Sequence, residues 1–174
     1  MDKAIILEVM LRTGVRSDAV TVATLVEALG KCNPPRVDEA KSLIQKMDEE
    51  GFVSNNNARV STALIRACGH SLDMVGAVST YAAIEKPDIF AFNALLYSLC
   101  HGGQTKKSLE VLAANAKNRK EEHDFIEIDV ATFSILISSL LDIKSTGASK
   151  AAFKLYKDMK RSWSISPDTG LVDM

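Results

Sequence analysis

The sequence predicts an all-α fold, a right-handed α-solenoid built from helix-turn-helix repeats. The first observation behind this prediction is an apolar pattern at positions i, i+3, i+4 and i+7, which is typical of one buried helical face and recurs along the chain. The second is that the copies return at a period of about 37 residues, with turn-forming residues between them. No alternation of apolar and polar residues indicates a strand.

The first helix of each repeat carries one set of these copies. They begin at Val22, Ser61, Phe92 and Phe133. The copy at Ser61 is weaker than the others, because Ser61 and Cys68 stand where the other copies have larger apolar side chains. Each copy predicts a helix with one buried stripe.

A second helix follows each first helix. Its copies of the pattern begin 16 to 19 residues downstream, at Ala40, Ala77, Ser108 and Ala152. A small residue opens every copy, which would let the two helices of a repeat approach closely. Each repeat is therefore expected to be a helical hairpin.

Turn residues mark the junctions between repeats, as at Pro87-Asp88 and Pro167-Asp168. The organisation predicted from them is one repeat array over 1–174: the end of a repeat at 1–18, repeats at 19–57, 58–88, 89–129 and 130–168, and the start of a further repeat at 169–174. Because no polar cap is visible at either end, we expect a longer array or partners that cover the ends.

Composition excludes several classes of protein. The chain has 174 residues, of which 47% are hydrophobic, so it can bury a core and is not expected to be disordered. A net charge of −1 gives no support for a polybasic nucleic-acid binder. No apolar stretch approaches the roughly 20 residues that cross a bilayer, so no membrane insertion is expected.

No set of residues predicts catalysis or metal binding. His70, His101 and His123 lack cysteine or carboxylate partners at ligand spacing. Cys100 lies beside His101 but lacks the third group that would orient a nucleophilic pair. We therefore expect no enzyme, no cofactor and no metal.

Several segments taken together resemble the pentatricopeptide repeat family. They are DIFAFNALLYSLCHGGQ (88–104), VATFSILIS (130–138) with DMK (158–160), RVDEA (36–40) with KMDEEG (46–51), and MLRTGVRSD (10–18). The resemblance covers about residues 1–168. The sequence departs from the family pattern in a charged insertion at 117–124 and in a short second repeat. The tetratricopeptide family is disfavoured, because its Trp-Leu-Gly-Tyr signature is absent.

The resemblance implies a protein of mitochondria or chloroplasts that binds single-stranded RNA, one base per repeat. In the family, a residue of the first helix and the last residue of the repeat read each base together. The matching pairs are Ala23 with Asn55, Thr62 with Asp88, Asn93 with Asp129, and Ser134 with Asp168. The residues implied to flank the stacked bases are Val20, Arg59, Phe90 and Ala131. The family's code then implies the preference N-G-U-G from 5′ to 3′.

Two other interpretations stay open at the level of sequence. The aspartates after proline can serve only as helix caps. The first helices also carry few cations, so RNA binding by this array alone is expected to be weak. The chain can instead be a structural subunit that docks on other proteins of a large organellar complex, such as a ribosome. A role as the recognition part of protein-only ribonuclease P would need an Asp-rich metal site, which the sequence lacks.

Overall fold

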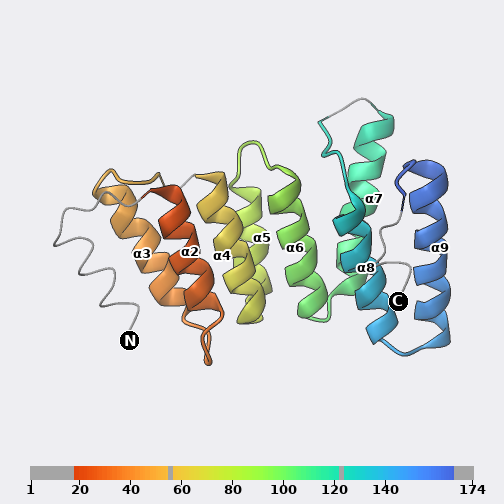
Figure 1. Cartoon of the computed structure of the whole chain (residues 1–174), viewed down its shortest axis with the longest axis horizontal. Coiled ribbons are helices and arrows are strands. Elements are labelled where there is room, and N and C mark those ends of the chain that lie inside the picture. The colour runs from red at the N-terminus through yellow and green to blue at the C-terminus, as the bar shows by residue number, and fades with distance from the viewer. Residues whose placement is uncertain (1–17, 55–56, 122–123, 167–174) are drawn as a thin grey trace. The chain divides into compact units, whose positions relative to one another are not determined.

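The computed structural model describes residues 18–54, 57–121 and 124–166, and these form eight α helices and no strand. The helices are α2 (Ala19–Gly30), α3 (Val37–Glu49), α4 (Ala58–His70), α5 (Met74–Ala82), α6 (Ile89–His101), α7 (Thr105–Lys120), α8 (Val130–Asp142) and α9 (Thr146–Ser162) (Figure 1). The all-α fold predicted from the periodicity is confirmed. Each predicted repeat contains two of these helices, while residues 1–17 and 169–174 lie outside the described part.

The chain divides into two compact units. The first unit, Met1–Lys86, contains α2 to α5, and the second, Pro87–Met174, contains α6 to α9. In the first unit α2 packs against α3 and α4, and α4 packs against α5. In the second unit α6 packs against α7 and α8, and α8 packs against α9. Both units are therefore built from helical hairpins whose first helices lie side by side.

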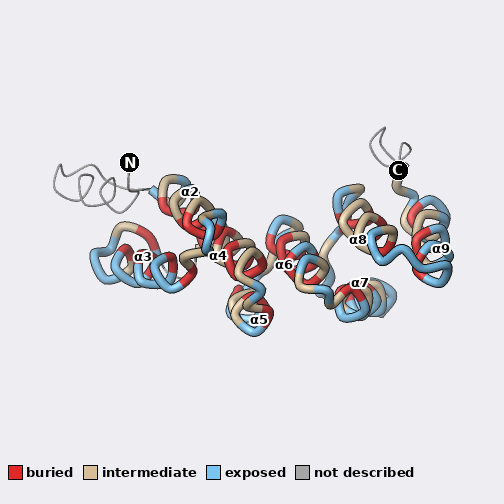
Figure 2. The backbone as a smooth tube through the Cα atoms, turned by 90° about the horizontal axis from the view of Figure 1, so that it is seen from below, coloured by how far each residue is buried: buried red, intermediate tan, exposed pale blue. Residues whose placement is uncertain are grey.

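The core of each unit lies between its helices, as the buried residues in Figure 2 show. The small residues that open the second-helix patterns are buried, with Ala40, Ala77 and Ser108 at 0% exposure and Ala152 at 3%. They let the helices of a hairpin approach, as predicted. No helix among the described residues is long and apolar enough to cross a bilayer.

The Cys68 thiol lies in the core of the first unit. It is fully buried on α4, and burial raises its pKa to about 11 from 9.0. A neutral, inaccessible thiol is a poor nucleophile. Cys32 and Cys100 are free and only partly buried.

We expect Cys68 to be the last of the three cysteines to react with iodoacetamide at pH 8, and to lose its protection in denaturant. Peptide mass spectrometry after timed alkylation measures this order. Because the unfolded thiol ionises at lower pH than the folded one, stability should also fall as the pH rises from about 9 to about 11. Labelling of native Cys68 as fast as Cys32 would contradict the burial.

Candidate nucleic-acid interface

The first helix of every hairpin begins after an Asp or Asn whose side chain caps it. Asp18, Asn57, Asp88 and Asp129 accept hydrogen bonds from backbone N–H groups at the starts of α2, α4, α6 and α8. The hydrogen bonds from Thr21 lower the pKa of Asp18 below its ordinary value. Asp88 and Asp129 therefore do act as helix caps, and any contact with a ligand comes in addition to this role.

The residue that caps α4 is Asn57. The sequence interpretation placed Asn55 at the end of the first complete repeat, and this assignment stays a prediction, while the cap equivalent to Asp88 and Asp129 is Asn57. Its side-chain oxygen accepts from the N–H groups of Arg59 and Val60 at 3.1 and 3.3 Å. Asn55 lies outside the described residues. Three consecutive asparagines are equally good caps by residue type, so the start of α4 decides which one is used.

In the second unit, Asn93 and Asp129 lie together. Asn93 is on the second turn of α6, and its Nδ2 donates to Oδ1 of Asp129 at 3.2 Å. The Thr132 hydroxyl on α8 donates to Oδ1 of Asn93 at 2.8 Å. Thr132 is fully buried and completes a capping box with Asp129. The carboxylate and the hydroxyl thus fix which way the Asn93 amide points.

The oriented amide keeps hydrogen-bonding capacity for a ligand. A primary amide has two N–H donors and two acceptor lone pairs, and the contacts with Asp129 and Thr132 use one of each. Asn93 is half-buried and so remains accessible. It can therefore present one donor and one acceptor, side by side, to the edge of a base.

For the other three predicted pairs, the structure describes single members rather than the pair. Ala23 is 8% exposed and belongs to the core of the first unit. The Thr62 hydroxyl donates to the Ala58 carbonyl oxygen of its own helix at 2.7 Å. Thr62 is in the first unit and Asp88 in the second, so each is described only within its own unit. Ser134 is half-buried on α8, while Asp168 lies outside the described residues.

The four residues implied to flank stacked bases occupy equivalent places. Val20, Arg59, Phe90 and Ala131 are each the second residue of a first helix, and all four are exposed. Phe90 is 66% exposed, which is unusual for a large apolar side chain. Phe90 and Arg59 offer flat faces suited to stacking on a base.

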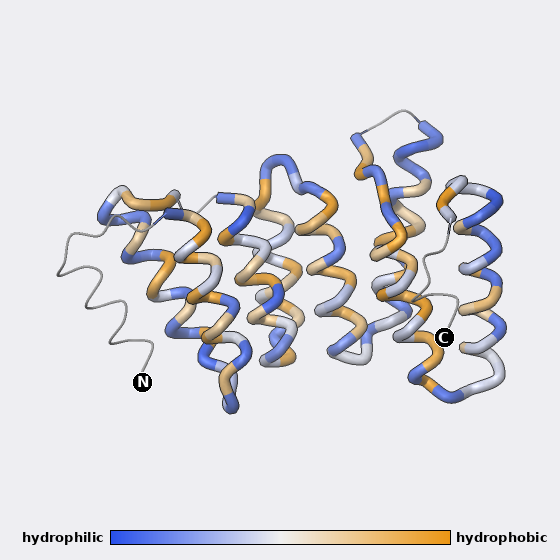
Figure 3. Tube along the Cα trace, viewed as in Figure 1, coloured by the Kyte–Doolittle hydropathy of each residue, from blue (hydrophilic) through white to orange (hydrophobic). Residues whose placement is uncertain are grey.

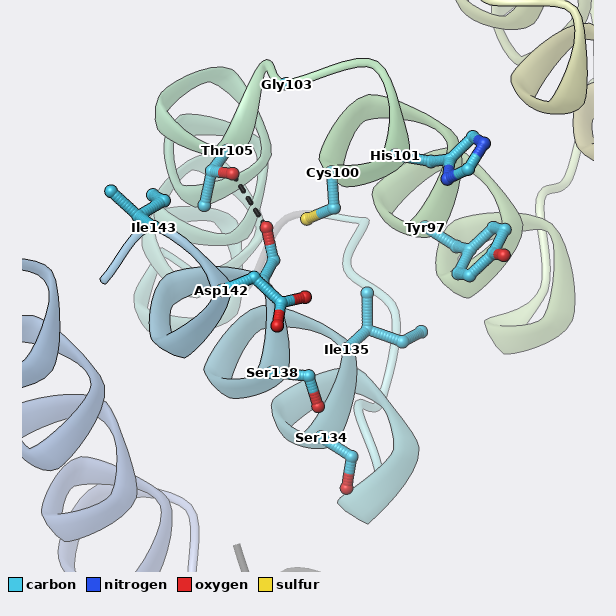
Figure 4. Close-up of a pocket in the computed structure, with 11 residues that line it drawn as sticks. Tyr97, Cys100, His101, Gly103, Thr105, Ser134, Ile135, Ser138, Asp142 and Ile143 are labelled. Atoms are coloured by element: carbon cyan, nitrogen blue, oxygen red, sulfur yellow. Dashed lines mark hydrogen bonds between the residues drawn. The ribbon is translucent and has the colours of Figure 1, made fainter. Parts of the chain in front are cut away.

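A groove lies between α6 and α8 in the second unit (Figure 4). It has a volume of about 620 Å³. Tyr97 and His101 line it from α6, where their rings stack at 5.9 Å; spacing of four residues puts both on the face of Asn93. Ser134, Ser138 and Asp142 line it from α8. Ser134 therefore borders this groove, and Asn93 lies one turn before Tyr97 on α6.

Cys100 also lines this groove, but it is a packed thiol. Its Sγ lies 3.3 Å from Oγ of Ser108 on α7. Within residues 18–54, 57–121 and 124–166, no three His, Cys, Asp or Glu side chains gather as metal ligands. His123 lies outside the described residues.

The first helices carry little free positive charge. In the first unit, Glu27 lies 2.7 Å from Lys31 and 4.0 Å from Arg66, and the hydrogen bond from Lys31 lowers the pKa of Glu27. In the second unit, α6 and α8 contain no Lys or Arg, and Asp142 borders the groove. A phosphate backbone lying along α6 and α8 would find no cation on those helices.

Helical hairpins whose first helices have equivalent caps define an α-helical repeat protein. The model of the pentatricopeptide repeat matches residues 90–113, which span α6 and half of α7. A mitochondrial pentatricopeptide repeat-containing protein of Arabidopsis thaliana is 24% identical over 155 residues, which are 89% of this chain and 18% of the relative. The chain thus contains one segment that matches the pentatricopeptide repeat and is similar to a protein named for such repeats. It spans about a fifth of the length of that relative.

Sequence reasoning missed two residues at these helix starts. One is Asn57, which caps α4 and lies two positions after the predicted Asn55. The other is Thr132, whose hydroxyl holds the oxygen of the Asn93 amide while Asp129 holds its nitrogen. An Asp followed three residues later by a hydroxyl residue at a helix start is a capping-box signal, and it was present at 129–132.

Proposed function

We propose that this chain is a single-stranded RNA-binding helical-repeat module of an organellar factor for RNA processing, RNA stability or translation. The observation that carries the proposal is the Asn93 amide, held by Asp129 and Thr132 with a donor and an acceptor left over. Holding a reader in one orientation before binding reduces the entropy lost on binding.

The free hydrogen-bonding groups agree with the bases that the family's code implies. Uracil presents an N–H donor next to carbonyl acceptors, which complements the remaining acceptor and donor of Asn93. The Thr62 hydroxyl spends its proton on Ala58 and so offers only lone pairs. Guanine presents N–H donors on its pairing edge, and these fit Thr62. Ala23 is buried and apolar, so the first complete repeat would contribute no base preference.

The organellar location is part of the proposal. The name of the Arabidopsis relative describes it as mitochondrial. We assign the chain to a mitochondrion or a chloroplast on that family relationship.

A structural, protein-docking subunit of an organellar complex is the second candidate. The charge distribution favours it, because α6 and α8 carry no Lys or Arg and Glu27 pairs with both Lys31 and Arg66. A subunit of this kind would bind RNA weakly and without base preference.

Base preference at Asn93 separates the two functions. We expect the chain to bind a labelled single strand containing GUG about fivefold more tightly than strands with GCG, GAG or GGG in the same context, since one hydrogen bond is worth about 1 kcal/mol. In the Asn93→Ser variant the preferred central base should change from U towards G. Fluorescence anisotropy at two salt concentrations measures both affinities.

The matched control is Asn118→Ser, the same change on α7 at an exposed position away from the groove. It should keep the preference for U. Equal affinities for all four strands, or an unchanged preference after Asn93→Ser, would count against base reading and for the docking function.

A further inference from the structure

The outer face of α9 carries a stripe of positive charge. Lys150, Lys154, Lys157 and Arg161 are all exposed and follow one another at spacings of four, three and four residues, which places them on one helical face. Phe153 lies among them at 60% exposure, and Nζ of Lys157 is 4.3 Å from the centre of its ring. We call these five residues the α9 stripe. Figure 3 shows the hydrophilic outer side of α9.

The cations of the stripe are not neutralised by neighbours. In the part of the chain that the structure describes, none of the four forms an ion pair. Asp158, the one carboxylate of α9, is half-buried and off the stripe. The positive potential of the face is therefore open to an anionic partner.

The equivalent helix of the first unit shows that this charge is not required by the fold. Ala40 and Met47 of α3 and Ala152 and Met159 of α9 are the matching buried residues of the two helices. The positions of α3 that match the stripe are Asp38, Lys41, Ser42, Gln45 and Glu49. These positions of α3 hold two carboxylates and one cation, whereas the α9 stripe holds four cations.

The same comparison shows that the stripe stays accessible within an array. In the first unit α4 follows α3 and packs against it, yet all five matching positions of α3 remain exposed. A further hairpin after α9, packed in the same way, would leave the stripe in solvent.

We infer that the α9 stripe is a second RNA contact, independent of sequence, that binds the phosphates of a single strand and stacks an unpaired base on Phe153. The inference rests on the proposed RNA-binding function and supplies the cations that α6 and α8 lack. Lysines interleaved with an exposed aromatic ring are suited to single strands, because phosphates pair with the cations while any base stacks on the ring. An interface with an acidic protein would need a larger apolar centre than one phenylalanine.

The test removes the four positive charges of the stripe in one variant and four positive charges of α7 in a control variant, and compares the RNA affinities of the two. One variant carries Lys150→Gln, Lys154→Gln, Lys157→Gln and Arg161→Gln. The control carries Lys106→Gln, Lys107→Gln, Lys117→Gln and Lys120→Gln, four exposed lysines of α7. Both have the same net charge, and circular dichroism checks that both are folded.

We expect the stripe variant to bind a labelled single-stranded GUG oligonucleotide at least about tenfold more weakly than the control. Its plot of log affinity against log salt should flatten by about 3, since each phosphate contact to a single strand contributes about 0.7. Phe153→Leu, which keeps the apolar character and removes the ring, should weaken single-strand binding by about fivefold or more and leave duplex binding unchanged.

Other outcomes would overturn the inference. Equal losses in the stripe and α7 variants would show an effect of net charge alone. Binding of labelled poly-glutamate as tight as that of RNA, and lost in the stripe variant, would assign the stripe to an acidic protein. If the unmodified chain shows no preference for U but the stripe variant still binds RNA more weakly than the α7 control, only the base-reading function is contradicted. If the chain prefers U but the stripe variant binds as tightly as the α7 control, only this inference is contradicted.

Discussion

Replacing Phe133 with alanine is expected to lower the free energy of unfolding of the second unit by about 3 to 5 kcal/mol. Phe133 is fully buried on α8, and its ring packs edge-on against Trp163 at 6.3 Å. The guanidinium of Arg119, on α7, lies 4.6 Å from the centre of the Trp163 ring. The truncation therefore opens a cavity where α7, α8 and the end of α9 meet. A loss of this size is a large part of the stability of an ordinary domain.

Tryptophan fluorescence measures this loss directly, because Trp163 is the one tryptophan of the chain. Urea unfolding followed by its emission gives the free energy for the unit that contains it. The control is Phe153→Ala, the same truncation at a 60% exposed position of α9, where a change of about 0.5 kcal/mol or less is expected. Similar losses in both variants would show that the core of the second unit is not centred on Phe133.

Much of the fold follows from residue spacing, because buried helical faces impose a period that the sequence displays. The copies that begin at Val22, Phe92 and Phe133 predict buried stripes, and all three residues are 2% exposed or less. The weak copy at Ser61 still forms α4, since Val60 and Ile65 supply buried apolar surface beside the buried Ser61. Helix periodicity tolerates such a substitution because tertiary packing stabilises the helix.

Less of the candidate site could be predicted, because it depends on contacts between helices. The position of Asn93 relative to Asp129 is set by how α6 packs on α8, which no local pattern encodes. Ala23 occupies the reader position by spacing, yet it lies in the core. The choice of Asn57 over Asn55 depends on where α4 begins. The division into two compact units likewise follows from packing that spacing does not reveal.

The charge distribution explains why one surface cannot perform the whole proposed function. Under the proposed function Asn93 and Ser134 would select bases, but α6 and α8 have no Lys or Arg to bind the phosphates. The α9 stripe has the opposite character, with four cations and no base-specific amide. Base selection and phosphate binding would then depend on different helices, and variants of each should affect specificity and salt dependence separately.

The close approach of α2 and α4 gives the second large effect. Gly30 lies at the end of α2, and a Cβ atom built on it would be 2.5 Å from Cα of Ala67 on α4. Alanine is ordinarily the better helix former by about 1 kcal/mol. At this site the backbone of α4 blocks the new methyl group, so we expect Gly30→Ala to destabilise the first unit by about 1 to 3 kcal/mol. Hydrogen exchange of the amides in α2 and α4 localises the loss.

The test is whether Gly30→Ala lowers or raises the free energy of unfolding, and the matched control is Gly147→Ala on α9. A Cβ atom at Gly147 would meet no atom within 4 Å, so Gly147→Ala should follow helix propensity and stabilise the second unit by up to about 1 kcal/mol. The two identical substitutions are thus expected to act in opposite directions, because one helix approaches a neighbour and the other faces open space. Stabilisation by Gly30→Ala would mean that α2 and α4 pack less closely than the structure shows.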